Sequence, residues 1–231
     1  MTIDWHPVYL SLKVAVIALG FVLAFGVVIA LLMTRRQFPG KVVVEALITM
    51  PLVLPPVVTG FLLLLLIGKH GPIGSFLTSY FDTQIIFTPA AAVLAAVIIA
   101  FPLMYQSAKA AFQSIDTNLE DAARTLGSSE IRVFFTITIP LALPGLIAGS
   151  VLSFARALGE FGATIMIAGN IPGKTQTIPL AIYFAAEAND LSTAGIYVTI
   201  ISIITFAAIL WLNTWIKSKT IHRNGNGGSR C

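Results

Sequence analysis

Long apolar runs separated by short polar connections constrain this chain more than any other feature of its sequence. About five runs are long enough to cross a bilayer as helices, over residues 12–33, 47–67, 89–107, 141–168 and 195–216. A hydrocarbon core about 30 Å thick takes about 20 residues of helix to cross. Because backbone polar groups in lipid must be satisfied within the segment itself, runs of this kind predict helices. We therefore expect an all-α polytopic membrane protein with a single transmembrane domain over residues 1–216.

The composition supports this expectation and excludes others. The chain of 231 residues is 57% hydrophobic and only 10% charged, whereas soluble domains carry about 25% charged residues. The length leaves no room for a sizeable soluble domain beside the spans. The formal charge of +4 does not indicate nucleic-acid binding, because basic residues of membrane proteins gather in cytoplasmic loops.

Basic residues also predict the topology. Arg35, Arg36 and Lys41 fall in the first connection, and a basic tail over 217–231 follows the last run. The positive-inside rule places both in the cytoplasm. With about five spans, the N-terminus then lies outside and the C-terminus lies in the cytoplasm. We expect the tail to be disordered.

Prolines predict irregular helices in two of the runs. Pro51, Pro55, Pro56 and Gly60 indicate that the second run is kinked or partly non-helical. Broken backbone at membrane depth is tolerated only against protein or a wet cavity, so Pro55 and Pro56 either line a transport pathway or belong to a proline-tolerant helix packed on its neighbours. Pro102 is expected to break the third run.

Two connections between the runs differ in character. Residues 68–88 are rich in Gly, Ser and Asp and predict a loop. Residues 169–190 are too polar to span and too apolar for a free loop, and they predict a re-entrant or interfacial helix around Ile178 to Ala186.

Residues 116–140 form a charged segment between apolar runs, within a predicted cytoplasmic loop over 108–140. Thr117 and Glu120 have the spacing of a capping box at the start of a short helix. That helix carries Leu119, Ala122, Ala123 and Leu126 on one face. Gly127 follows where a left-handed residue closes a helix.

A second short helix is expected after the glycine. Ser128 or Ser129 can cap it, and Pro140 is expected to limit it. Two helices with a glycine elbow and a face of small residues suit a helix-in-groove contact with another protein. An amphipathic loop lying on the membrane surface is the alternative.

Arg156 and Glu160 are ionisable residues inside the fourth run, four positions apart on one predicted helix face. Charged groups in a span face the bundle interior or water. Arg156 therefore either presents positive charge to an anion in a pathway, or forms a structural ion pair with Glu160 near the outer interface. Gly159 and Gly162 permit close helix packing beside them.

No catalytic or metal-binding pattern stands out, since the three histidines are scattered. Residues 169–175 resemble a phosphate-binding loop but have three residues between the glycines instead of four, and Pro172 lies inside them. We therefore expect no enzymatic activity and no bound cofactor. Any ATP-driven work would need a separate ATPase.

The charged segment resembles the coupling-loop signature of ABC importer permeases. The matching residues are Glu120, Ala122, Gly127, Ile137 and Pro140, with Asp121 in a variable slot and Ile139 where the family usually has Leu. The resemblance implies the type I permease core of about five transmembrane helices. It also implies that ATPase subunits dock on the loop, where Ala123 extends the face of small residues.

Two further stretches, 154–164 and 169–179, are similar to the oxyanion branch of these permeases, and with residues 35–40 and 51–56 they look most like molybdate permeases. The resemblance implies a homodimer in a bacterial or archaeal plasma membrane. It implies two cytoplasmic ATPase subunits that use ATP and Mg²⁺, and an extracytoplasmic molybdate-binding protein. Sulfate, thiosulfate or tungstate permeases remain alternatives within the family.

Two other classes of protein stay as alternatives. A secondary transporter would show inverted repeats and acidic residues for ion coupling, and Glu160 is the only acidic residue within the predicted spans. A membrane enzyme would need clustered His, Asp or Cys at one membrane face. Neither pattern is visible in the sequence.

Overall fold

The computed structural model describes residues 3–225, and every regular element in this range is helical. The elements are α1 (His6–Arg35), α2 (Lys41–Val53), α3 (Pro56–Ile67), α4 (Pro72–Phe81), α5 (Pro89–Gln113), α6 (Thr117–Thr125), α7 (Glu130–Val133), the π-helical turn η1 (Phe134–Thr138), α8 (Ile139–Leu158), α9 (Gly162–Ile167), α10 (Ile178–Glu187) and α11 (Leu191–Gly225). Four helical stretches are long and apolar enough to cross a membrane, or up to five if the bent pair of α2 and α3 counts as one. The expected all-α membrane fold is confirmed.

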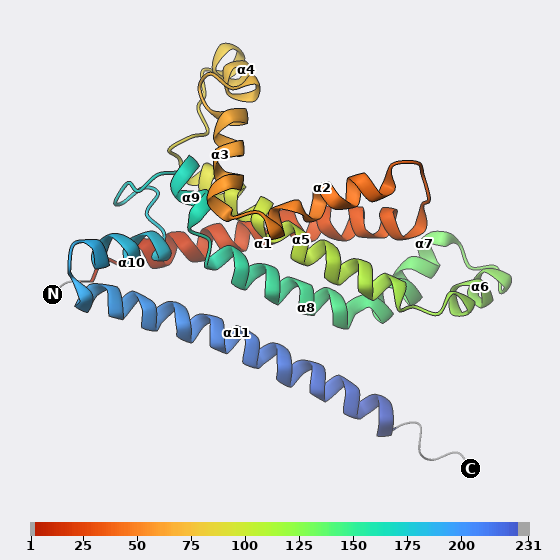
Figure 1. Cartoon of the computed structure of the whole chain (residues 1–231). Helices are drawn as coiled ribbons and strands as arrows, with labels where there is room; N and C mark the ends of the chain where they lie inside the picture. Colours follow the sequence, from red (N-terminus) through yellow and green to blue (C-terminus); the bar gives the residue numbers. More distant parts are fainter. Residues whose placement is uncertain (1–2, 226–231) are drawn as a thin grey trace.

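Helices α1, α5 and α8 form the centre of the structure and lie side by side (Figure 1). Their contact is built from small residues, because Ala18, Ala95 and Ala108 are all fully buried. A Cβ added at Gly149 of α8 would lie 2.7 Å from the Ser107 Cβ of α5. Small side chains let helix backbones approach closely, which is how helices associate in a membrane.

The third apolar run is not broken by its proline, and that prediction was wrong. Helix α5 is continuous through Pro102, which is buried in the bundle. A single proline in a membrane helix is tolerated because neighbouring helices and local adjustments compensate for the lost backbone bond. Both α5 and α1 also extend beyond the predicted spans 89–107 and 12–33.

The second run is broken more severely than a kink. Helices α2 and α3 meet at an angle of 117°, and α3 points away from the layer of α1, α5 and α8 (Figure 1). Residues 47–67 are therefore not one straight span. The loop predicted over 68–88 is also wrong in part, because residues 72–81 form α4, which packs back on α3.

The fourth run differs from its prediction at both ends. Helix α8 ends at Leu158, and α9 begins only at Gly162. At its start, α7, η1 and α8 run on without interruption, so Pro140 does not limit a short helix as expected. In η1 the Ile139 N–H donates to the Phe134 carbonyl, five residues back. The next residue, Pro140, has no N–H, so no backbone donor is left unpaired where the π-helical turn passes into α8.

Helix α10 confirms the short helix expected near residue 178 and is bound to the start of the chain. The Ser11 hydroxyl accepts a hydrogen bond from the Ile178 N–H at 2.7 Å, and the Tyr197 hydroxyl donates to the Asp4 carbonyl at 2.7 Å. Helix α11 extends to Gly225, so residues 217–225 are helical where a disordered tail was predicted. Residues 226–231 lie outside the described range.

The ends of the helices sort into two groups (Figure 1). The connection from α1 to α2, helix α6 and the C-terminal end of α11 lie at one end of the molecule. The N-terminus and α10 lie at the other. This is the grouping that the basic residues predicted, and the assignment of these ends to the two sides of a membrane stays a prediction.

Candidate functional site

Helix α6 begins differently from the capping box that its sequence predicted. Asp116 is the N-cap, and its carboxylate accepts a hydrogen bond from the Asn118 N–H at 3.0 Å. Thr117 is therefore inside the helix, and Glu120 does not reach back to the helix start. An aspartate is as good an N-cap as a threonine or better, which leaves Glu120 available for other partners.

The glycine elbow after α6 is confirmed. Gly127 has a φ of 84°, in the region that favours glycine. Its N–H donates to the Arg124 carbonyl at 2.9 Å, and the Ser128 N–H donates to the Ala123 carbonyl at 3.1 Å. This pair of bonds is a Schellman motif. Ser129 then caps α7, its hydroxyl accepting from the Arg132 N–H at 3.4 Å.

Glu120 is buried at 7% exposure and joins three parts of the fold. Its Oε1 accepts from Arg35 Nη2 of α1 at 2.6 Å and from the Thr138 hydroxyl of η1 at 2.5 Å. Its Oε2 accepts from Arg124 Nη2 at 3.3 Å. A buried carboxylate is stable only with charged and hydrogen-bonding partners, and Glu120 has both.

Arg124 extends this network across the elbow. Its Nε and Nη2 donate to the two oxygens of Glu130, at 2.6 and 3.2 Å, and its Nη1 donates to Asp121 at 2.7 Å. These hydrogen bonds, that with Glu130 first, raise the pKa of Arg124 above its ordinary value. The fork geometry of a guanidinium suits such paired bonds. Helices α6 and α7 are thereby held at a fixed angle.

The apolar side of this region faces outward. Leu119, Leu126, Ile131 and Phe135 are 49%, 86%, 73% and 64% exposed. We call these four residues the docking face. Large apolar side chains grouped on a surface mark sites of contact with another protein or with the membrane.

The other predicted coupling residues differ in how far they are exposed. Ala122, Asp121 and Pro140 are exposed, while Ala123 and Ile137 are half-buried. A cavity of about 380 Å³ adjoins the ionic network and is lined by Thr34, Arg35, Glu120, Asp121 and Arg124 among others. The structure thus brings the predicted coupling residues together at one end of the molecule.

The second candidate site is the break between α8 and α9. Arg156 Nη1 donates to Glu160 Oε2 at 2.7 Å, and Glu160 Oε1 accepts from the Ala163 N–H at 2.8 Å. Glu160 is 2% exposed. We predicted that Arg156 and Glu160 share one helix face. That prediction was wrong, because α8 ends at Leu158 and Glu160 lies beyond it. Glu160 instead ties the end of α8 to the first turn of α9.

Of the other predicted pathway residues, the structure brings Pro56 and Gly162 into contact. A Cβ at Gly162 would lie 2.9 Å from the Pro56 Cβ, so only glycine allows α9 to lie this close to α3. Pro55 is the N-cap of α3. Gly159 is different, since a Cβ there would meet only the Ala155 carbonyl of its own helix, at 3.6 Å.

Three functional candidates were missed by the sequence reasoning. Arg35 was noted only as a topology signal, and Thr138 was not singled out. Glu45 of α2 accepts from Lys109 Nζ of α5 at 2.8 Å, a pair separated by 64 residues. The isolated acidic and basic residues in otherwise apolar helices were the only available signal for this pair.

Two candidates remain, a metal site and the loop 169–175. Within the described residues, no group of three or more His, Cys, Asp or Glu side chains is placed to hold a metal ion. In the loop 169–175, the buried Thr175 hydroxyl accepts from the Ile171 N–H and donates to the Gly169 carbonyl, both at 3.1 Å. This loop is closed on itself by its own hydrogen bonds.

Comparison with known protein families identifies the family to which this chain belongs. The family model for binding-protein-dependent transport system inner membrane components matches residues 16–222. The chain belongs to this family. Its members span the inner membrane, and the chain is accordingly a multi-pass component of a transport system in the plasma membrane.

Individual relatives within this permease family are similar over nearly their whole length. The chain is 46% identical over 222 residues to the molybdenum transport system permease protein ModB of Escherichia coli, covering 96% of this chain and 97% of the relative. It is 47% identical over 206 residues to the putative molybdenum transport system permease protein YvgM of Bacillus subtilis, covering 89% and 91%. A probable sulfate transport system permease protein of Prototheca wickerhamii is 35% identical over 204 residues, covering 88% and 80%.

Solved structures show that the permease fold is shared. A chain of the methionine ABC transporter MetNI has a TM-score of 0.69 at 16% identity, covering 92% of this chain and 94% of that one. A chain of a bacterial alginate ABC transporter in complex with its periplasmic protein has a TM-score of 0.72 at 16% identity, covering 90% and 76%.

Proposed function

We propose that this chain is the membrane-spanning permease subunit of an ATP-driven ABC importer for molybdate. The support for the substrate is the similarity to two molybdenum transport permeases at 46% and 47% identity, against 35% for a sulfate permease. A tungstate, sulfate or thiosulfate permease is the alternative within the same family.

The proposed assembly contains two copies of this chain, two cytoplasmic ATPase subunits and an extracytoplasmic molybdate-binding protein. The chain itself binds no cofactor in this proposal, and its ATPase partners use ATP and Mg²⁺. The docking face is the proposed contact with the ATPase. Its apolar side chains would enter a groove on the partner, as in other helix-in-groove contacts.

The observation that carries the coupling role is the position of Glu120. It is on α6, next to the docking face, and its carboxylate is bonded to Arg35 of α1 and to Thr138 of η1. A push on α6 is therefore transmitted to two long helices at once, since η1 continues into α8. Closure of the ATPase dimer would move these helices together, and ATP would stabilise one orientation of the pathway over the other.

The pathway is proposed to pass near the break between α8 and α9. The side chain of Arg156 is 29% exposed, whereas that of Glu160 is 1% exposed. Arg156 therefore has free surface to present positive charge to an oxyanion while its buried partner holds it in place. Close packing of Pro56 on Gly162 connects this break to the bent pair of α2 and α3.

The test is uptake in proteoliposomes that contain the chain, its ATPase and its binding protein. ATP-dependent molybdate uptake that survives an excess of sulfate is the expected result. Sulfate uptake would overturn the substrate and leave the permease role standing. Uptake by the chain alone without ATP would overturn the coupling role and favour a secondary transporter.

A further inference from the structure

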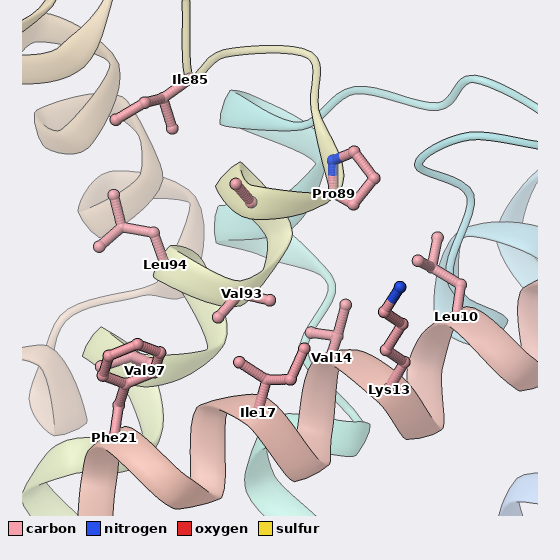
Figure 2. Close-up of a pocket in the computed structure, with 11 residues that line it drawn as sticks. Leu10, Lys13, Val14, Ile17, Phe21, Ile85, Pro89, Val93, Leu94 and Val97 are labelled. Atoms are coloured by element: carbon pink, nitrogen blue, oxygen red, sulfur yellow. The ribbon is translucent and has the colours of Figure 1, made fainter.

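A groove runs between the first halves of α1 and α5 and is almost entirely apolar (Figure 2). Its volume is about 540 Å³. Val14, Ile17 and Phe21 of α1 face Val93 and Val97 of α5 across it, and Leu10 lies at one end of the lining. Apolar surface of this extent in a membrane protein has to be covered either by lipid or by another protein.

The length of the groove matches one leaflet of a bilayer. From Leu10 to Phe21 the groove follows α1 over twelve residues, and the eleven steps between them rise about 16 Å at 1.5 Å per residue. The hydrocarbon core is about 30 Å thick in total. A groove of this length takes one acyl chain lying along the helices.

Exposed aromatic residues identify the end of the groove that lies at the membrane surface. Trp5, the N-cap of α1, and Tyr9 in its first turn are 61% and 63% exposed. Trp and Tyr concentrate at the level of lipid headgroups. The start of α1 is therefore at headgroup depth, and the groove extends from there into the hydrocarbon.

Among the residues that the structure describes, Lys13 is the only charged one that lines the groove. Figure 2 shows its side chain rising from α1 toward the end at which α5 begins. Its Nζ lies 5.9 Å from the centre of the Tyr9 ring. No carboxylate in the described residues lies within salt-bridge distance of it. An ammonium group near the interface without a carboxylate partner is complementary to a phosphate.

We propose that the α1–α5 groove binds an anionic phospholipid, with one acyl chain in the groove and the headgroup phosphate on Lys13. A helix of a second protein copy suits the groove less well. Such a helix is 10–12 Å across, and it would cover Lys13 with apolar surface, where an unpaired charge is costly. The lipid supplies both the apolar chain and the negative charge.

Native mass spectrometry tests whether the charge of Lys13 contributes to lipid binding. The chain is purified for this together with the proteins that remain bound to it. Phosphatidylglycerol is expected to bind more tightly than phosphatidylcholine. Lys13→Gln should weaken phosphatidylglycerol binding about fivefold, because one basic residue near the membrane surface contributes about 1 kcal/mol. Lys174→Gln is the matched control, since Lys174 is exposed but does not line the groove. Equal effects of the two substitutions would overturn the proposal.

Ala90→Trp tests the shape separately from the charge. Ala90 lines the groove and is exposed, so a larger side chain there fills the groove without entering the core. Binding of both lipids should fall, while the size of the purified complex stays the same. Loss of a second copy from the complex in this variant would show that protein occupies the groove, and would overturn the proposal.

A photo-crosslinking amino acid at Ile17 identifies the occupant in the intact membrane. Ile17 is 38% exposed and lies midway along the groove. An adduct with the mass of a phospholipid is the expected product. A crosslink to a polypeptide as the main product would assign the groove to protein contact instead.

Discussion

Arg35 and Glu120 are 85 residues apart in the sequence, and their side chains meet at 2.6 Å. The side chain of Arg35, at the end of α1, is 38% exposed, whereas the side chain of Glu120 in α6 is 9% exposed. The carboxylate thus depends on its partners more than the guanidinium does. Helix α6 is held to α1 by this bond and cannot move alone without breaking it.

Replacement of Glu120 by Gln should uncouple ATP hydrolysis from transport. The amide keeps its bond to Thr138 but loses the charge that binds Arg35 and Arg124. We expect the free energy of unfolding to fall by about 1.5–3 kcal/mol, the range for hydrogen bonds to charged groups. Uptake should fall more than ATP hydrolysis in the reconstituted complex.

The control for this variant is Asp121→Asn on the same helix. The Asp121 side chain is 66% exposed, and a surface ion pair contributes about 0–1 kcal/mol. Thermal unfolding in detergent compares the two variants. If both shift the melting temperature equally, the burial of Glu120 has no energetic role.

Replacement of Gly127 by Val should weaken ATPase docking and leave membrane insertion intact. A Cβ at this position meets nothing within 4 Å, so the effect comes only from the backbone φ of 84°. A β-branched residue in this conformation costs about 1–3 kcal/mol, which the elbow can relieve by changing the angle between α6 and α7.

Gly127→Asn is the matched control, because asparagine tolerates the left-handed conformation. A pull-down of the ATPase with the permease should recover less ATPase with the valine variant and a near-normal amount with the asparagine variant. Normal recovery with valine would contradict a docking role for the elbow.

Replacement of Gly60 by Ala should separate α3 from α9. The new Cβ would lie 2.7 Å from the Ala163 Cα and 2.9 Å from the Met166 Cβ. Backbone cannot yield as a side chain can, so we expect a loss of about 1–3 kcal/mol in stability, typical of overpacking.

Gly20→Ala is the matched control for Gly60→Ala, and we expect it to raise stability rather than lower it. Gly20 lies within α1, and a Cβ there meets nothing within 4 Å. Removing a glycine from the inside of a helix should stabilise it by about 0.5–1 kcal/mol. Thermal unfolding of both variants should therefore give shifts of opposite sign.

Substitutions at Arg156 and Glu160 separate the pathway role from the structural one. Arg156→Gln alone leaves a buried carboxylate unpaired, which destabilises by about 3–5 kcal/mol for a fully buried pair and by less here because Arg156 is partly exposed. The double substitution to Gln removes both charges, and stability should recover. Molybdate uptake should stay low in the double variant if Arg156 attracts the oxyanion. Recovery of uptake together with stability would assign the pair to structure alone.

The prolines illustrate what could be read from the sequence and what could not. Pro55 and Pro56 follow each other, so two donors are lost together and the residue before them is driven to extended backbone. Leu54 and Pro55 have ψ of 141° and 134°, and the helix breaks there as expected. Pro102 and Pro140 are single, and the neighbouring bundle and the π-helical turn accommodate them. That tolerance depends on packing, which the local sequence does not contain.

The charged segment, residues 116–140, also combines features that the local sequence predicts with features that depend on distant residues. The glycine elbow depends on neighbouring residues and was predictable from them. The partners of Glu120 were not, because Arg35 comes from a distant helix and the local spacing favoured a capping box with Thr117. The short helix α4 was missed because its Gly, Ser and Pro residues are typical of loops, although Pro72 at its first turn and Asp82 at its end are suitable helix boundaries.

The number of residues in the π-helical turn η1 sets the direction in which the docking face points. A π-helical turn holds one residue more than the α-helical turn it replaces, and one residue of α-helix corresponds to a rotation of about 100°. Phe135 of the docking face lies within this turn, and α6 and α7 come before it. Deleting one residue from 134–138 would turn this segment into α-helix and rotate α7 relative to α8. The extra residue held in η1 therefore sets the direction in which the docking face points relative to α8.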